Sequence, residues 1–156
     1  MKTSTTLALI LTAALGPAAT LVTPPPAAPL QGVWQADVRV QSLDVTVPRG
    51  GTQITVRAVI YSDNDDDARA VRADILLPVG VGVLRVPAGC KASPAAVPNL
   101  NARVTCELGD LAVRGFRDLT LVTTSAPGPR ARFAVLVASD TPDPDPANNY
   151  SERFVP

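Results

Sequence analysis

The chain has 156 residues, which is the size of one domain with a single hydrophobic core. Its 14 Lys and Arg residues balance its 14 Asp and Glu residues, so no net charge attracts nucleic acid or an anionic membrane surface. The absence of His removes the side chain most often used for acid–base catalysis near neutral pH and for metal ligation. The 16 Pro and 10 Gly residues, among many Val, Ala and Thr residues, are typical of short strands joined by turns.

The N-terminus has the features of a secretory signal peptide. Lys2 precedes an apolar run over residues 7–15, and small residues follow it. This run is shorter than the ~20 apolar residues that cross a bilayer, and Pro17 interrupts it, so we expect cleavage and no membrane span afterwards. The sequence therefore predicts a signal peptide over residues 1–18 and a protein that is secreted, periplasmic or on the cell surface.

Residues 19–35 are rich in Pro and Ala and include three consecutive prolines at 24–26. This composition favours an extended polyproline II conformation and has too little apolar bulk for a core. We expect residues 19–35 to be a linker and residues 36–156 to form the folded domain.

The first strand of the domain is expected within residues 38–47. Val38 and Val40 point one way, and Leu43 and Val45 continue the alternation in the opposite phase. A β-bulge or a switch between sheets near Ser42 would produce this change of phase.

Seven further segments show strand patterns, each closed by turn residues. They are residues 52–61, 71–77, 81–86, 103–108, 116–124, 130–139 and 150–155. The side chains expected to face inward are Ile54, Val56, Ala58 and Ile60; Val71, Ala73, Ile75 and Leu77; Val104, Cys106 and Leu108; Leu119 and Leu121; and Ala131, Phe133, Val135 and Val137. Residues 87–101 are expected to be a long loop, and residues 116–124 and 130–139 central strands. Seven or eight short strands with this spacing favour an all-β, antiparallel β-sandwich.

Cys90 and Cys106 are the only cysteines of the chain. In an exported protein, the simplest interpretation is a disulfide across the long loop. The alternative, a reactive thiol or a metal-binding pair, has no His and no second Cys pair to support it.

Two segments resemble a known family. Residues 138–149 read Ala-Ser-Asp-Thr-Pro-Asp-Pro-Asp-Pro-Ala-Asn-Asn, and residues 104–111, which follow Cys90, read Val-Thr-Cys-Glu-Leu-Gly-Asp-Leu. They resemble the closing signature and the Cys-containing middle of the bacterial conserved repeat domain, known as domain of unknown function eleven. The resemblance covers most of the chain after the predicted leader. It implies an Ig-like fold in an exported or surface protein, and it implies no activity.

The acidic loop at residues 62–68 is the first candidate metal site. Asp63, Asp65 and Asp67 offer oxygen ligands of the kind that Ca²⁺ prefers. An EF-hand loop requires Gly where Ala68 stands, and Asp74, at the position of the bidentate Glu, fits the outer face of a strand. We therefore expect a solvated loop and no metal or other cofactor, with a calcium site as the weaker alternative.

Other polar and aromatic residues have structural interpretations too. Asp140, Asp143 and Asp145 form a second acidic cluster, but the alternating prolines hold that segment extended. Trp34 is expected to pack as a lid over one end of the core, with ligand stacking as the alternative. Six arginines are expected on outer strand faces, where they discourage edge-to-edge pairing; they are Arg39, Arg57, Arg72, Arg103, Arg130 and Arg132.

The sequence thus predicts an exported, non-catalytic Ig-like domain, most simply a monomer, with a structural or protein-interaction role at the cell envelope or outside the cell. The alternative is a small binding module that holds a carbohydrate or protein ligand through the loop 62–68, with or without calcium. A recess with convergent polar groups would favour the alternative, since a plain sandwich usually lacks one.

Overall fold

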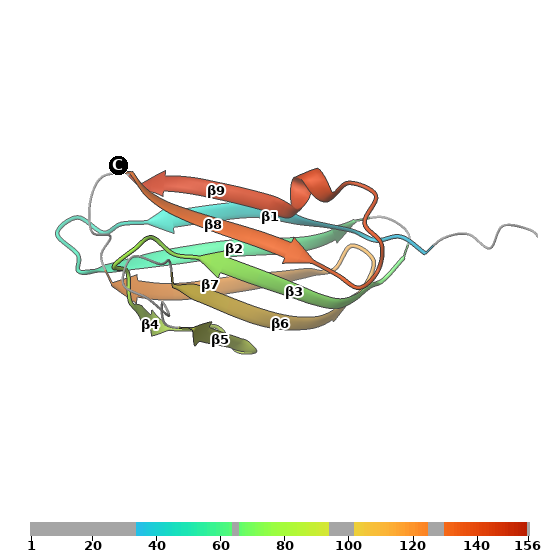
Figure 1. Ribbon diagram of the computed structural model, residues 1–156, viewed down its shortest axis with the longest axis horizontal. Coiled ribbons are helices and arrows are strands. Elements are labelled where there is room, and N and C mark those ends of the chain that lie inside the picture. The colour runs from blue at the N-terminus through green and yellow to red at the C-terminus, as the bar shows by residue number, and fades with distance from the viewer. Residues whose placement is uncertain (1–33, 64–65, 94–101, 125–129, 156) are drawn as a thin grey trace, which may run out of the picture. The chain divides into compact units, whose positions relative to one another are not determined.

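The computed structural model describes residues 34–63, 66–93, 102–124 and 130–155, shown in colour in Figure 1. The predicted leader and almost all of the predicted linker lie outside these residues. Nine strands and one short 3-10 turn are present in the described ranges, and no helix there is long and apolar enough to cross a membrane. The elements are β1 (Asp37–Thr46), β2 (Gln53–Asp63), β3 (Ala68–Leu76), β4 (Val83–Arg85), β5 (Cys90–Ser93), β6 (Arg103–Leu111), β7 (Phe116–Thr124), β8 (Ala131–Ala138), η1 (Pro146–Asn149) and β9 (Tyr150–Val155).

The strands form two antiparallel sheets that face each other (Figure 1). The four-stranded sheet has the order β1-β2-β7-β4, and the five-stranded sheet has the order β5-β6-β3-β8-β9. The neighbours β1, β2 and β7 correspond in position to strands A, B and E of an immunoglobulin domain, and β9, β8 and β3 to its strands G, F and C; β4 pairs with β7 at the place of strand D, but β5 and β6 come between these two in the chain. The predicted sandwich is confirmed, and β7 and β8 are interior strands as expected.

The predicted change of phase in the first strand is a β-bulge. The register between β1 and β2 shifts between Val40 and Ser42. Because of this extra residue, Val38 and Leu43 both face the core although five positions separate them. The bulge thus keeps one long strand in contact with the core at both of its ends.

The core lies between the two sheets and consists of the side chains that the alternation predicted. All of the inward-facing residues expected from residues 52–61, 71–77, 103–108, 116–124 and 130–139 are buried. Phe133 is the largest fully buried side chain of the described chain. No backbone ladder joins one sheet to the other, so this apolar contact is the main force between the layers.

The structure has one strand more than the seven or eight expected. The additional strand is β5, which lies in the segment predicted to be a loop. Only its first residue, Cys90, is buried, so it has no alternating pattern that sequence reasoning detects. It forms because Cys90 lies opposite Cys106 in the ladder with β6, where a covalent bond joins the two strands.

We expect the substitution Phe133→Ala to lower the free energy of unfolding by about 3–5 kcal/mol, because it removes a large buried ring and leaves a cavity between the sheets. Urea unfolding of the purified domain measures the change. Phe116→Ala is the matched control, since Phe116 is 62% exposed on β7 and its loss should cost less than about 0.5 kcal/mol. Equal effects of the two substitutions would contradict the assignment of the core.

Candidate functional site

The two cysteines form the disulfide that the sequence predicted. The Sγ atoms of Cys90 and Cys106 are 1.99 Å apart, and the bond joins the directly opposed residues of β5 and β6. Both cysteines of the chain are therefore in this bond, so neither is a thiolate for nucleophilic attack or metal binding. The role of the pair is to hold the edge strand β5 against β6.

Replacing both cysteines, Cys90→Ala with Cys106→Ala, should lower the free energy of unfolding by about 3 kcal/mol, because the bond closes a loop between residues 16 positions apart. Adding a reductant to the unmodified protein should lower its melting temperature in the same direction and leave the double variant unchanged. Free thiols in the untreated protein, together with a melt that ignores reductant, would contradict the bridge.

The described acids of the loop, Asp63, Asp66 and Asp67, each have a different partner. Asp63 Oδ2 lies 3.3 Å from Nη2 of Arg39, whose guanidinium also lies over the ring of Tyr61. Asp65 lies outside the described residues. Across the part of the chain that is described, no three acidic or Cys side chains are placed to hold a metal ion.

The other two acids of this loop support its backbone. Asp66 Oδ2 accepts a hydrogen bond of 3.0 Å from the N–H of Gln35. Asp67 Oδ1 accepts one of 3.0 Å from the N–H of Val113. These carboxylates satisfy donors of neighbouring segments, as the side chains of turn residues often do.

The second acidic segment, residues 139–149, is a clasp between the two sheets. On one side it is bonded to the segment that enters and begins β1, at one edge of the four-stranded sheet. These hydrogen bonds run from Ala36 N to Pro142 O (3.1 Å), from Val38 N to Asp143 Oδ2 (3.1 Å) and from Asn148 Nδ2 to Asp37 Oδ1 (2.9 Å). Asp143 Oδ1 also accepts from the N–H of Asp145 at 2.8 Å, which shapes the clasp itself.

On its other side the clasp is bonded to β3, in the five-stranded sheet. The buried hydroxyl of Thr141 accepts from the N–H of Arg69 at 3.0 Å and donates to the carbonyl of Asp67 at 3.2 Å. The N–H of Asp140 donates to the carbonyl of Arg69 at 2.9 Å, and its carboxylate pairs with Arg72 at 2.9 Å. The segment that resembles a family signature therefore has a structural role here.

We expect Thr141→Val to lower the free energy of unfolding by about 1–3 kcal/mol, since the isosteric change leaves the N–H of Arg69 without its acceptor. Chemical denaturation measures the loss. Thr46→Val on the exposed end of β1 is the matched control and should change stability by less than about 0.5 kcal/mol. If the two variants are equally stable, the clasp does not hold the sheets as described.

The outer strand faces carry paired charges. The single Nε–H of Arg57 is shared between Oδ1 and Oδ2 of Asp118, with N···O distances of 3.1 and 2.9 Å, and Nη2 also donates to Oδ2; these contacts hold the pKa of Asp118 below its usual value. Arg132 donates to the Tyr150 hydroxyl at 2.7 Å and pairs with Glu152 at 2.8 Å, and both contacts raise the pKa of Arg132. Such exposed pairs contribute little to stability but keep charge along the strands.

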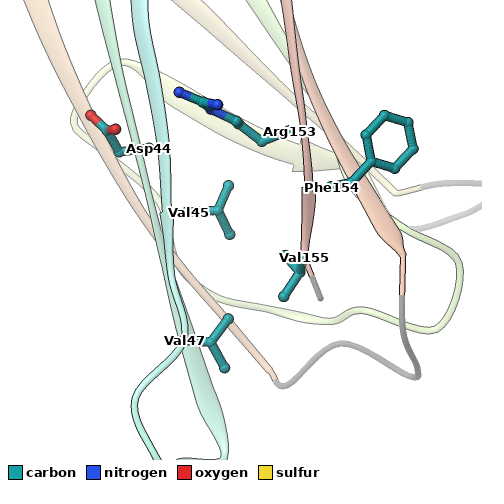
Figure 2. Close-up of a pocket in the computed structure, with 6 residues that line it drawn as sticks. All are labelled: Asp44, Val45, Val47, Arg153, Phe154 and Val155. Carbon is teal, nitrogen blue, oxygen red and sulfur yellow. The ribbon is translucent and has the colours of Figure 1, made fainter.

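The first recess that described residues line lies between the edge strands β1 and β9. We call it the seam; it has a volume of about 420 Å³ and is lined by Asp44, Val45, Val47, Arg153, Phe154 and Val155. Figure 2 shows Val45 and Val47 extending toward β9, whereas Phe154 points away from the gap. Arg153 crosses the gap and donates from Nε to the carbonyl of Leu43 at 3.1 Å. The seam is thus lined by valines of both strands together with Asp44, and the Arg153 side chain bridges it.

The second recess, of about 380 Å³, lies on the outer face of the five-stranded sheet. Four of its polar side chains are already partnered, and three of them are in one group: Asp74 accepts from the Thr105 hydroxyl at 2.7 Å and lies 3.8 Å from Arg103. Arg72, also in its wall, pairs with Asp140. A ligand here would have to break these pairs.

The third recess corrects the prediction for Trp34. The sequence favoured a lid over the core, but Trp34 is 63% exposed. Its ring instead lies against the guanidinium of Arg69, with the guanidinium carbon 5.6 Å from the ring centroid. Together with Asp140, Thr141 and Pro142, these two residues line a recess of about 310 Å³. Sequence reasoning missed this group because Arg69 and the clasp come from distant parts of the chain.

Comparison with known proteins does not identify the chain. No family model matches it, and no curated protein does either, so the resemblance to the conserved repeat domain stays a prediction. Among solved structures, a GH18 chitinase from Chromobacterium violaceum is similar over 77% of this chain, with 15% identity and a TM-score of 0.43. A GH20 exo-β-N-acetylglucosaminidase from Vibrio harveyi is similar over 79%, with 12% identity and a TM-score of 0.39. The chain spans less than a fifth of the length of these enzymes, 19% and 17% respectively, and similarity this low says nothing about its activity.

Proposed function

We propose that the chain is an exported, non-catalytic Ig-like domain that acts through protein contacts at the cell envelope or outside the cell. The observation that carries this proposal is the seam. It places the exposed or half-buried side chains of Val45 and Val47 between two strands that are each the last of their sheet. Edge strands with apolar side chains beside them are the surfaces to which extended protein segments add.

The disulfide supports the export part of the proposal. A bond between the only two cysteines forms and persists in an oxidising compartment, which agrees with the predicted signal peptide. It also holds β5 against β6, since β5 has little apolar surface of its own.

A catalytic role has less support from the polar side chains. Asp74, Asp118 and Glu152 are each paired with an Arg. Ser62, a buried hydroxyl with no hydrogen-bond partner in the described chain, is fully enclosed and has no access for a substrate. A nucleophile needs a neighbouring base and an open approach.

The alternative of a ligand site in the loop 62–68 is also less favoured. Asp66 and Asp67 are bonded to backbone N–H groups of other segments, and Asp63 pairs with Arg39. A ligand or a calcium ion would have to displace these partners, which lie on exposed segments.

A photo-crosslinking amino acid at Val47 tests the proposed contact in intact source cells. We expect a defined protein adduct at position 47 and none at Leu84, a matched control on β4 that is 52% exposed at the opposite edge of the same sheet, against 44% for Val47. Fractionation of the same cells should place the protein outside the cytoplasm, with its N-terminus shortened. Identical adducts at both positions, or full-length protein in the cytoplasm, would refute the proposal.

A further inference from the structure

Trp34 is the most exposed large apolar residue among those that the structure describes. An exposed indole forfeits the burial that makes Trp stabilising in a core. Large apolar groups left in contact with water beside polar ones often mark a place where something binds. The contacts around Trp34 show whether the rest of the structure holds the ring in this exposed position.

The backbone next to Trp34 is held on two sides. The N–H of Gln35 is bonded to Asp66, and the N–H of Ala36 is bonded to the carbonyl of Pro142. The ring is positioned by Arg69, whose guanidinium lies over it. The position of the indole is therefore defined before any ligand arrives, which lowers the entropic cost of binding.

An irregularity in β3 sets the direction of the Arg69 side chain. The register between β3 and β6 shifts on both sides of Val71, so Arg69 and Ala70 have no partners in that ladder. Ala70 has a φ of +48°, a left-handed conformation that non-glycine residues rarely adopt. It is kept there by a 2.8 Å hydrogen bond from its N–H to Asp110. Bulges and strained residues of this kind gather where a side chain is redirected to a functional site.

The polar groups of the recess leave hydrogen-bonding capacity for a ligand. Within the described chain no group accepts a hydrogen bond from the Arg69 guanidinium, which has five N–H donors. The charge of Asp140 is offset by Arg72, and the hydroxyl of Thr141 is committed within the clasp. The N–H donors that remain for a ligand beside the indole ring are therefore those of the Arg69 guanidinium.

We infer that the recess beside Trp34 binds one pyranose ring of a carbohydrate, with a preference for a ring that carries a carboxylate. A pyranose with equatorial substituents has a flat face of C–H groups that stacks on an aromatic ring, here on the part of the exposed indole that the Arg69 guanidinium does not cover, and it has oxygen acceptors around its rim. The planar guanidinium of Arg69 matches a carboxylate at the rim through two parallel hydrogen bonds. A volume of about 310 Å³ admits a single ring and little more.

The chain has one Trp, so its fluorescence reports on this recess alone. The test titrates the mature protein with methyl β-D-glucuronide and with methyl β-D-glucoside, which differ only in the carboxylate. We expect a saturable blue shift with both, with the glucuronide binding at least about five-fold more tightly at low salt and at roughly millimolar concentration. Acrylamide should quench the emission of the unliganded protein and quench it less when the glucuronide is present.

Variants separate the roles of the residues. Arg69→Ala should remove the preference for the glucuronide, whereas Arg85→Ala on β4 should keep it. Trp34→Phe, measured by calorimetry, should weaken both ligands, and Phe116→Ala should weaken neither. Thermal melts confirm that each variant is folded, and Arg69→Lys serves if Arg69→Ala is not, since a lysine keeps the charge but loses the paired hydrogen bonds.

Three results would overturn the inference. One is an emission unchanged by either glycoside up to about 50 mM, far above the millimolar range expected for one ring. Another is a preference for the carboxylate that survives in Arg69→Ala. The third is an indole already shielded from acrylamide in the unliganded protein, which would mean that other residues of the chain fill the recess. None of these results bears on the seam, so the proposed protein contact would stand or fall separately.

Discussion

The structure depends on the burial of one face of each sheet against the other. Every ladder of backbone hydrogen bonds lies within a sheet, so the two layers meet through side chains such as Ile54 and Phe133. A slip of one residue in any strand would turn its apolar side chains toward water. The bulge at Ser42 shows how strict this requirement is, because β1 takes up an extra residue and still directs both Val38 and Leu43 to the core.

Apolar burial is not directional, so it does not by itself fix how the two sheets are aligned. The hydrogen bonds of the clasp are directional and supply this constraint. Its prolines provide no N–H donors, and Asp143 accepts from the N–H of Val38 in β1 and from that of Asp145 within the clasp, so an irregular segment still satisfies its neighbours. Thr141 does the same for β3. The acidic composition of the clasp thus has a structural use, because carboxylates are short side chains that accept well from a turn or a strand end.

The sequence was informative where the signal is local. Alternation with period two identified the inward side chains of β2, β3, β6, β7 and β8, because each strand has one buried face. It failed where the partner is distant. Asp143 and Val38 are 105 positions apart, and Arg69 and Trp34 meet only because the clasp and a bulge bring them together. The strand β5 was missed for a similar reason, since its pairing depends on Cys106 and not on its own pattern.

The two candidate contacts lie at opposite ends of β1. Trp34 precedes the strand, and Val47 follows it. A strand of ten residues is about 33 Å long, which is several times the width of a sugar ring. A saccharide beside Trp34 would therefore not touch a protein segment in the seam, and the two would bind without steric competition. For binding at one site to affect binding at the other, the conformation of β1 itself would have to change. The bulge between Val40 and Ser42, midway along the strand, is where the ladder of β1 is already interrupted.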